Sequence, residues 1–329
     1  FNLIEACKFF IITNKKSKEN RISLIGDVSP DCDPNWLIDM PFSKPAQFKR
    51  KQKISNKNVG WSKLFNDWES PVNYEWDMKL QLNFSVLWTR IDFEDWIAIF
   101  HHETPKNEVI ASHSHYDFGS FVLYYKGNEI IIDPGRINYI QNYESNLYLS
   151  PKYHSTISLN DLPIVMRKGD RFYSKFYISS NFKKNFLNEN NKIVFSIEHD
   201  GLSRINSKKI FHTRVFKFTK SSLNICDKIN GEGTYKMECY FQLPLSNYKK
   251  SFTKNEKKQG KYSFNSLGIS IEIKNTNHEI SSKIYQGLNN PKLGWRSRYY
   301  GDEEASTSII YDGKINLPFE ANYEISLNK

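Results

Sequence analysis

The stretch ASHSHYDFGSFVLYYKGNEIIIDPG, residues 111–135, contains two short apolar runs that predict a β-hairpin. SFVLYY and NEIIID are separated by Lys126-Gly127, a two-residue loop typical of a hairpin turn. Such a turn places Asp133 opposite Ser120, or opposite Val122 if the turn falls one residue further on. Both runs are apolar on both faces, which predicts a buried hairpin in the centre of its sheet.

Two histidines, His113 and His115, stand just before this hairpin, and Asp133 returns to the same end of it. His154 begins a second predicted hairpin, KYHSTISLNDLPIV (152–165), which turns at Asn160-Asp161 and can reach the same rim. Imidazole and carboxylate groups are ligands for zinc and similar ions and also work as acids and bases. The residues therefore predict a metal or acid–base site. By spacing alone, H-x-H can equally be a pair of surface polar residues.

Downstream of about residue 80 the chain repeats short runs with a period of two, such as FSVLWTRI, RFYSKFYI and IFHTRVFKF. Gly, Asn, Asp and Pro separate these runs. This pattern predicts a mainly β protein, a large antiparallel β-sandwich.

The N-terminal segment has a different pattern. FNLIEACKFFII (1–12) has apolar residues at helical intervals, and GDVSPDCDPNW (26–36) is a loop rich in Asp and Pro. A lone helix cannot bury its own apolar stripe, so we expect it to be the end of a helical domain.

Composition narrows the classes of function. A chain of 329 residues with 15% aromatic residues can bury a sizeable core and is too apolar for a disordered protein. No apolar run is long enough to cross a bilayer. The net charge of +10 suits an anionic partner, although a generally Lys-rich composition gives the same value. No recognition helix or aromatic platform for nucleic acid is present, and the four cysteines lack the spacing of a zinc or redox motif.

The order of motifs resembles the β-sandwich half of heparinase II/III-like polysaccharide lyases over roughly residues 20–310. The matching segments are HSHYDFGSFVLYYKGNEIIIDPG, YHSTISLND and IEHDGLSRI followed by FHTRVFKF, with LIGDVSPD upstream. One departure is Ser114, where the family usually has Gly between the two histidines.

The resemblance implies a multilayered sandwich preceded by an (α/α) toroid, and cleavage of acidic, uronate-containing glycans by β-elimination in the cleft between them. It implies that residues 1–45 are the tail of the toroid with its loop, 46–79 a linker and 80–329 the sandwich. His113 resembles the catalytic histidine of the sandwich. His115, Asp133 and His154 resemble the ligands of a structural zinc. The toroid's catalytic Tyr and Asn or His have no counterpart here, so activity is expected to need that domain.

Four further residues are candidates for binding the substrate. Arg136 and Tyr139 follow the Asp-Pro-Gly turn at the predicted rim, where Arg136 suits a sugar carboxylate or an internal ion pair. His199 lines the cleft or is a hydrogen-bonded turn histidine, and Tyr299 stacks on sugar or packs in the sandwich. His101 and His102 are predicted to be surface residues.

Two rival functions remain. One is a non-catalytic module that binds glycan or acts as a scaffold, with a structural metal. The other is a cupin-type metalloenzyme, disfavoured because no Glu follows His115 on the same strand. Heparan-like, alginate-like and bacterial surface glycans all carry the required uronate. The Lys- and Asn-rich composition favours a bacterial protein. The family resemblance favours a periplasmic or secreted one, with a cytoplasmic one as the alternative.

Overall fold

The computed structural model describes residues 9–17, 20–27, 88–102, 115–164, 167–168, 171–172, 183–189, 192–205, 209–252, 260–298 and 301–328. These residues form mainly antiparallel strands, which confirms the predicted fold class. The strands are β1 (Ile11–Thr13), β2 (Asn20–Ile22), β3 (Trp88–Phe93), β4 (Trp96–His101), β5 (Phe121–Tyr125), β6 (Asn128–Ile131), β7 (Ile157–Leu159), β8 (Arg167–Lys168), β9 (Arg171–Phe172), β10 (Lys183–Glu189), β11 (Lys192–His199), β12 (Phe211–Phe218), β13 (Ser222–Asn230), β14 (Thr234–Pro244), β15 (Lys249–Phe252), β16 (Gly260–Phe264), β17 (Ile269–Thr276), β18 (Ser281–Gln286), β19 (Leu288–Asn289), β20 (Lys292–Leu293), β21 (Trp295–Arg296), β22 (Glu304–Asn316) and β23 (Phe319–Leu327). Helix α5 (Tyr143–Leu149) and the 3-10 turns η1 (Pro151–Tyr153) and η3 (Gly201–Ile205) connect them.

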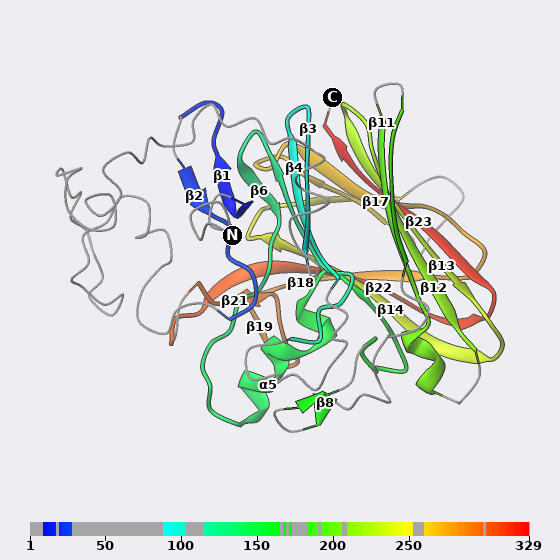
Figure 1. Cartoon of the computed structure of the whole chain (residues 1–329). Helices are drawn as coiled ribbons and strands as arrows, with labels where there is room; N and C mark the ends of the chain where they lie inside the picture. The colour runs from blue at the N-terminus through cyan, green and yellow to red at the C-terminus, as the bar shows by residue number, and fades with distance from the viewer. Residues whose placement is uncertain are drawn as a thin grey trace.

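An eight-stranded sheet forms one layer of the sandwich, in the order β10-β11-β12-β13-β23-β17-β16-β15. A four-stranded sheet (β3-β4-β5-β6) and a five-stranded sheet (β18-β22-β14-β7, with β21 beside β22) pack on one face of it (Figure 1). Phe100 of β4 lies 4.5 Å from Phe216 of β12, ring centroid to ring centroid. Phe241 of β14 lies 5.4 Å from Tyr323 of β23. Burial of these aromatic faces is the main source of the sandwich's stability.

The predicted hairpin is present, with one difference in register. Lys126 and Gly127 have φ of 52° and 80°, and Tyr125 pairs with Asn128, as expected for a two-residue turn. A bulge then pairs Leu123 with Ile131, so Asp133 faces neither Ser120 nor Val122. The cause lies just beyond the ladder, where the Ile132 N–H donates to the Gln242 carbonyl of β14. The chain is already turning toward the five-stranded sheet.

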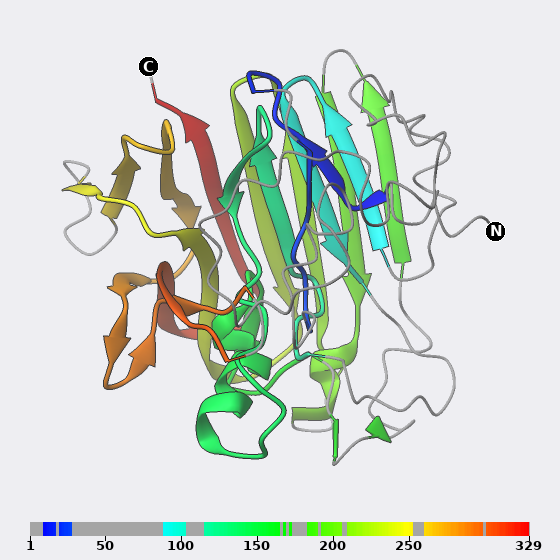
Figure 2. The same ribbon diagram turned by 90° about the vertical axis from the view of Figure 1, so that its left-hand side faces the viewer.

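Residues 9–17 and 20–27, which we call the strap, form a third layer. The strap contains the β1–β2 pair and crosses the outer face of the four-stranded sheet (Figure 2). Phe9 and Ile12 pack there against Ile99, Val122 and Tyr124. This cover explains why both faces of the hairpin are apolar. The inference of a central hairpin was wrong for β6, which is an edge strand of its sheet.

The predicted N-terminal helix does not extend to residue 12. Ile11 and Ile12 lie in β1, where β-branched side chains fit a strand better than a helix. Arg90 holds this backbone in place because its Nη1 donates to the carbonyls of Phe9 and Ile11, both at 2.8 Å. Residues 1–8 and 28–87 lie outside the described residues, so the boundaries at 45 and 80 stay predictions. No described helix is long and apolar enough to span a membrane.

Candidate functional site

His115, Asp133 and His154 come together in one buried cluster, as the sequence predicts. His115 lies just before β5, Asp133 just after β6 and His154 at the end of η1. One potential ligand atom from each side chain lies within 4.8 Å of the other two. The three residues are 5%, 7% and 0% exposed. His115 therefore points into the protein and is not a surface polar residue, which was the alternative reading of the H-x-H motif.

Asp133 is held from two sides. Its Oδ1 accepts hydrogen bonds from the backbone N–H groups of Gly26 and Gly135, both at 2.9 Å. Its Oδ2 lies 3.0 Å from Nδ1 of His154, whose Nε2 lies 3.1 Å from the Tyr148 carbonyl. Burial alone would lower the pKa of His154, but the charge and hydrogen bond of Asp133 outweigh it and raise that pKa above its ordinary value.

The strap contributes Asp27, a residue that the sequence did not single out. Asp27 Oδ1 lies 2.7 Å from Nε2 of His115, and the other ring nitrogen of His115, Nδ1, lies 3.2 Å from Nε2 of His154. A carboxylate at Nε2 fixes the proton there and leaves Nδ1 as the acceptor that faces the cluster. Nothing in the spacing along the chain indicates Asp27, which is 88 residues from His115.

Arg136 is also part of this network. Its Nη1 lies 3.1 Å from Asp27 Oδ2, and its guanidinium stacks over the Tyr139 ring at 4.5 Å. Arg136 is 9% exposed, whereas Tyr139 is 38% exposed. Of the two roles open to Arg136, the internal ion pair is the one present. Tyr139 keeps the accessible position that a sugar contact requires.

A second buried pair adjoins the cluster. His101 Nδ1 lies 2.9 Å from Asp117 Oδ2, and the ring of Trp88 stacks on His101 at 4.2 Å. Burial would raise the pKa of Asp117, but the charge and hydrogen bond of His101 and the charge of His154 outweigh it and hold that pKa well below its usual range. The prediction that His101 and His102 lie on the surface was wrong, since they are 8% and 0% exposed. His101 is the last residue of β4 and His102 directly follows it, at an end of the strand that is buried.

Comparison with known proteins identifies the fold and the family. A family model described as "Heparinase II/III-like, C-terminal" matches residues 85–324. The chain belongs to this family. Among solved structures it resembles heparan sulfate lyase HepC from Pedobacter heparinus, with 15% identity, a TM-score of 0.61, and coverage of 94% of this chain and 44% of that one. It also resembles a structure named heparinase III, with 13% identity, a TM-score of 0.61, and coverage of 98% and 47%.

These similarities at low identity establish the heparinase II/III-like sandwich and nothing finer. The chain spans less than half the length of either solved enzyme. No curated protein matches the sequence.

Two of the predicted site residues lie outside the described part of this heparinase II/III-like chain. His113 is two residues before His115, and the described segment begins at His115. Tyr299 falls in the gap between 298 and 301. Their predicted roles, catalysis and substrate binding, stay predictions.

His199 lies in the interior rather than on a cleft wall. It is 0% exposed, its Nε2 lies 2.9 Å from Nδ1 of His212, and its ring meets Phe118 edge-on at 5.1 Å. A side chain so enclosed has no surface for a sugar to touch, which corrects the substrate-binding prediction. The alternation of buried and half-buried residues along β11 contained this signal, because His199 has the same parity as Ile193, Phe195 and Ile197.

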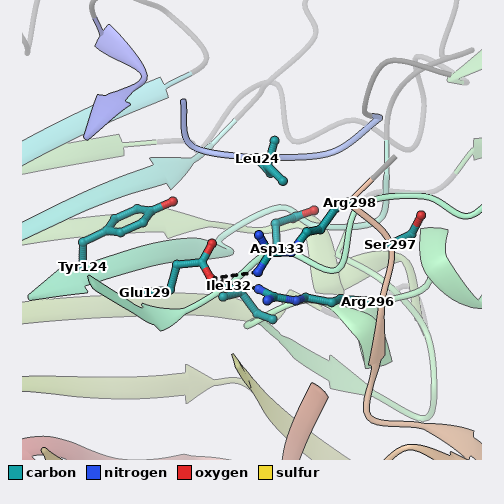
Figure 3. A pocket seen from close by; sticks show the side chains of 8 residues that line it. All are labelled: Leu24, Tyr124, Glu129, Ile132, Asp133, Arg296, Ser297 and Arg298. Atoms are coloured by element: carbon teal, nitrogen blue, oxygen red, sulfur yellow. Dashed lines mark hydrogen bonds and ion pairs between the residues drawn. The ribbon is translucent and has the colours of Figure 1, made fainter. Parts of the chain in front are cut away.

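A small pocket that is partly open to solvent lies beside Asp133 (Figure 3). Arg296 Nη1 lies 2.9 Å from Glu129, and Arg298 Nε lies 2.7 Å from Glu304. Since each guanidinium already has a carboxylate partner, the pocket has no evident excess of positive charge for an anion. It is lined by Leu24, Tyr124, Glu129, Ile132, Asp133, Arg296, Ser297 and Arg298.

The donor set of the cluster fits zinc. Two imidazoles and one carboxylate are three of the ligands that zinc commonly takes, and Asp27 can act as the outer partner that orients a ligating histidine. The hydrogen bond between Asp133 and His154 shows that the two side chains already share one small space.

Proposed function

We propose that this chain is the sandwich half of a polysaccharide lyase that cleaves uronic-acid-containing glycans by β-elimination. The other wall of the cleft is a helical toroid domain of the same protein. Membership of the heparinase II/III-like family supports the reaction class, and the spans of the solved relatives, which are more than twice as long, support a partner domain. Membership of the family favours a periplasmic or secreted protein.

The reaction requires three groups at the sugar. The uronate carboxylate must be neutralised to acidify the proton at C5, a base must remove that proton, and an acid must protonate the leaving oxygen at C4. The sandwich provides His113 for the proton transfers, and the toroid provides the remaining groups.

The observation that carries this assignment is the engagement of His115. Nε2 of His115 bonds to Asp27 and Nδ1 faces His154, so both ring nitrogens are used inside the protein. Of the H-x-H pair, His113 is therefore the histidine assigned to the substrate. The buried cluster anchors the backbone two residues away from it.

Zinc held by His115, Asp133 and His154 would add a fixed positive charge and cross-link the three segments. Neighbouring side chains hold this site in place. Asp27 orients His115, and Arg136 pairs with Asp27 and stacks on Tyr139. Tyr139 and Tyr299 are assigned to contacts with the sugar chain. Arg136 and His199 are buried and bonded within the protein, so neither is assigned to direct contact with the substrate.

The test is the formation of unsaturated uronate, followed by its ultraviolet absorbance, from heparan-like, alginate-like and bacterial surface glycans. The protein is used together with its helical domain. His113→Ala should lose roughly 100- to 10,000-fold in rate, as expected for removal of an acid–base group. His278→Ala, at a loop histidine bonded to Asn277 and Asn316, is the matched control and should retain the rate.

Burial of the entire triad favours one alternative function. A non-catalytic sandwich that binds glycan or acts as a scaffold would use the same closed cluster as a structural metal site. Glycan binding without product, in protein that holds its zinc, would support that alternative over the lyase.

A further inference from the structure

A network of four buried polar side chains crosses the interior of the sandwich. His199, His212, Arg214 and Asp227 come from the neighbouring strands β11, β12 and β13, and each is at most 1% exposed. His199 is the cross-strand partner of His212, and Arg214 is the partner of Asp227. They stand in an otherwise apolar layer, where ionisable groups are costly unless they are fully paired.

Within this network, each histidine donates its hydrogen bond toward Asp227. The Gly201 N–H donates to Nδ1 of His199 at 3.2 Å, so the His199 proton is on Nε2 and is donated to Nδ1 of His212 at 2.9 Å. His212 in turn donates from Nε2 to Asp227 Oδ1 at 2.8 Å. Arg214 Nε lies 3.3 Å from the same oxygen. The network therefore presents one fixed carboxylate to the guanidinium and holds Arg214 in place.

Arg214 uses its other end to join the two histidine-bearing segments. Its Nη1 donates to the carbonyl of Gly119 at 3.1 Å and to the carbonyl of Ser155 at 3.0 Å. Ser155 directly follows His154, and Gly119 is four residues after His115. These two segments precede β5 and β7, which belong to different sheets. One nitrogen thus bridges the two backbones that carry the two histidines.

We propose that Arg214 is a positioning residue that sets the separation of the His115 and His154 segments. The hydrogen bonds among Asp227, His212 and His199 fix its guanidinium. The guanidinium in turn fixes the carbonyls of Gly119 and Ser155. The consequence for metal binding rests on the proposed zinc site. A buried ion pair can often be replaced by apolar residues without loss of stability, so the presence of this one is not by itself evidence of a stabilising role.

The experiment compares Arg214→Lys with Arg296→Lys. Lysine keeps the charge but lacks the planar fork, so it cannot hold a carboxylate and two carbonyls in the same arrangement. Arg296 is the matched control, because it is also buried and pairs with two carboxylates, Glu129 at 2.9 Å and Glu304, which lie outside the cluster. Zinc affinity is measured by chelator competition, and the site is also filled with Co²⁺ to record its visible absorption spectrum.

We expect Arg214→Lys to bind zinc about 10- to 100-fold more weakly and to show an altered Co²⁺ spectrum, as for loss of an outer partner of a metal ligand. Arg296→Lys should keep both the affinity and the spectrum even if it lowers the denaturation midpoint. Equal effects of the two substitutions on affinity and spectrum would overturn the inference.

Amide hydrogen exchange keeps the inference separate from the proposed zinc. If wild-type protein binds no zinc or Co²⁺, the metal proposal fails, and exchange in residues 116–120 and 154–157 decides about Arg214. Faster exchange there in Arg214→Lys than in Arg296→Lys supports the positioning role. The same exchange pattern in both variants excludes it.

Discussion

Asp27 Oδ1 lies 2.7 Å from Nε2 of His115, although the two residues are 88 positions apart in the sequence. The strap carries Asp27 across the outer face of the four-stranded sheet. The backbone N–H of Gly26, the residue just before Asp27, donates to Asp133. Two residues of the strap thus complete the cluster that the hairpin begins. The candidate metal site therefore combines residues of the strap with residues that flank the four-stranded and five-stranded sheets.

Asp27→Asn should weaken zinc binding without abolishing it. The amide keeps the size of the side chain but loses the charge that orients and polarises His115, so a loss of about 10- to 100-fold in affinity is expected. Chelator competition measures it. Asp95→Asn is the control, because Asp95 also pairs with the strap, through Lys15 at 2.7 Å, and should leave the affinity unchanged. Equal affinity of Asp27→Asn and wild type would show that Asp27 does not orient the ligand.

The stability of the metal-free protein should depend on the protonation of His154. Its pKa is raised in the folded state, so this group stabilises the fold fully below its unfolded pKa of about 6.5. That contribution is lost as the pH rises through the folded pKa. Urea midpoints of chelator-treated protein, measured on both sides of neutrality, should therefore fall toward alkaline pH. The His154→Gln variant should lack this component, and an unchanged slope in it would contradict the assignment.

The buried pair of Asp117 and His101 should contribute strongly to stability. Asp117→Asn leaves His101 without its carboxylate, and removal of one partner of a buried ion pair costs roughly 3–5 kcal/mol. Urea denaturation near neutral pH measures this loss. Because the pKa of Asp117 is lowered, its contribution is present above its unfolded pKa of about 3.9 and is lost as the pH falls through the folded pKa.

Asp95→Asn provides the comparison for this measurement. Asp95 belongs to a largely exposed ion pair, for which a cost of only about 0–1 kcal/mol is expected. Similar losses in Asp95→Asn and Asp117→Asn would mean that burial does not strengthen the Asp117–His101 pair.

Gly127→Ala should loosen the strap. The residue has φ of +80°, and an added Cβ would lie 2.4 Å from Cα of Asn14, so both the turn and the strap must shift. Gly268→Ala is matched in backbone conformation, with φ of +67°, but its Cβ would meet nothing within 4 Å. It should cost only the left-handed strain, about 1–2 kcal/mol.

Denaturant midpoints and limited proteolysis distinguish the two glycine variants. Gly127→Ala should be the less stable protein and the one cut faster within residues 9–27. If both variants lose the same stability and the strap stays protected, the close approach of the turn to Asn14 is not important for holding the strap.

Local sequence patterns predicted the features that depend on residues close together in the sequence, such as turns and hairpins. The turns at Lys126-Gly127 and Asn160-Asp161 were predictable because few residues tolerate positive φ, and all four of these have it. The meeting of His115, Asp133 and His154 followed from the ends of those hairpins.

Contacts between distant segments could not be predicted in this way. Asp27 reaches His115 only because the strap packs across a sheet, and the bulge beside Leu123 arises where β6 turns toward β14. Arg136 paired internally because Asp27 was there to accept it. The burial of His101 depends on contacts outside its own strand, with Asp117 and Trp88.

The most direct test of the metal centre is the zinc content of purified wild-type protein beside four alanine variants. Wild type should hold about one zinc per chain, as for a single closed site with this ligand set. His115→Ala, Asp133→Ala and His154→Ala should each lose it, and His113→Ala should retain it. Metal-free wild-type protein, or loss of zinc in His113→Ala as in the other three variants, would contradict the division of the H-x-H pair into one metal ligand and one catalytic residue.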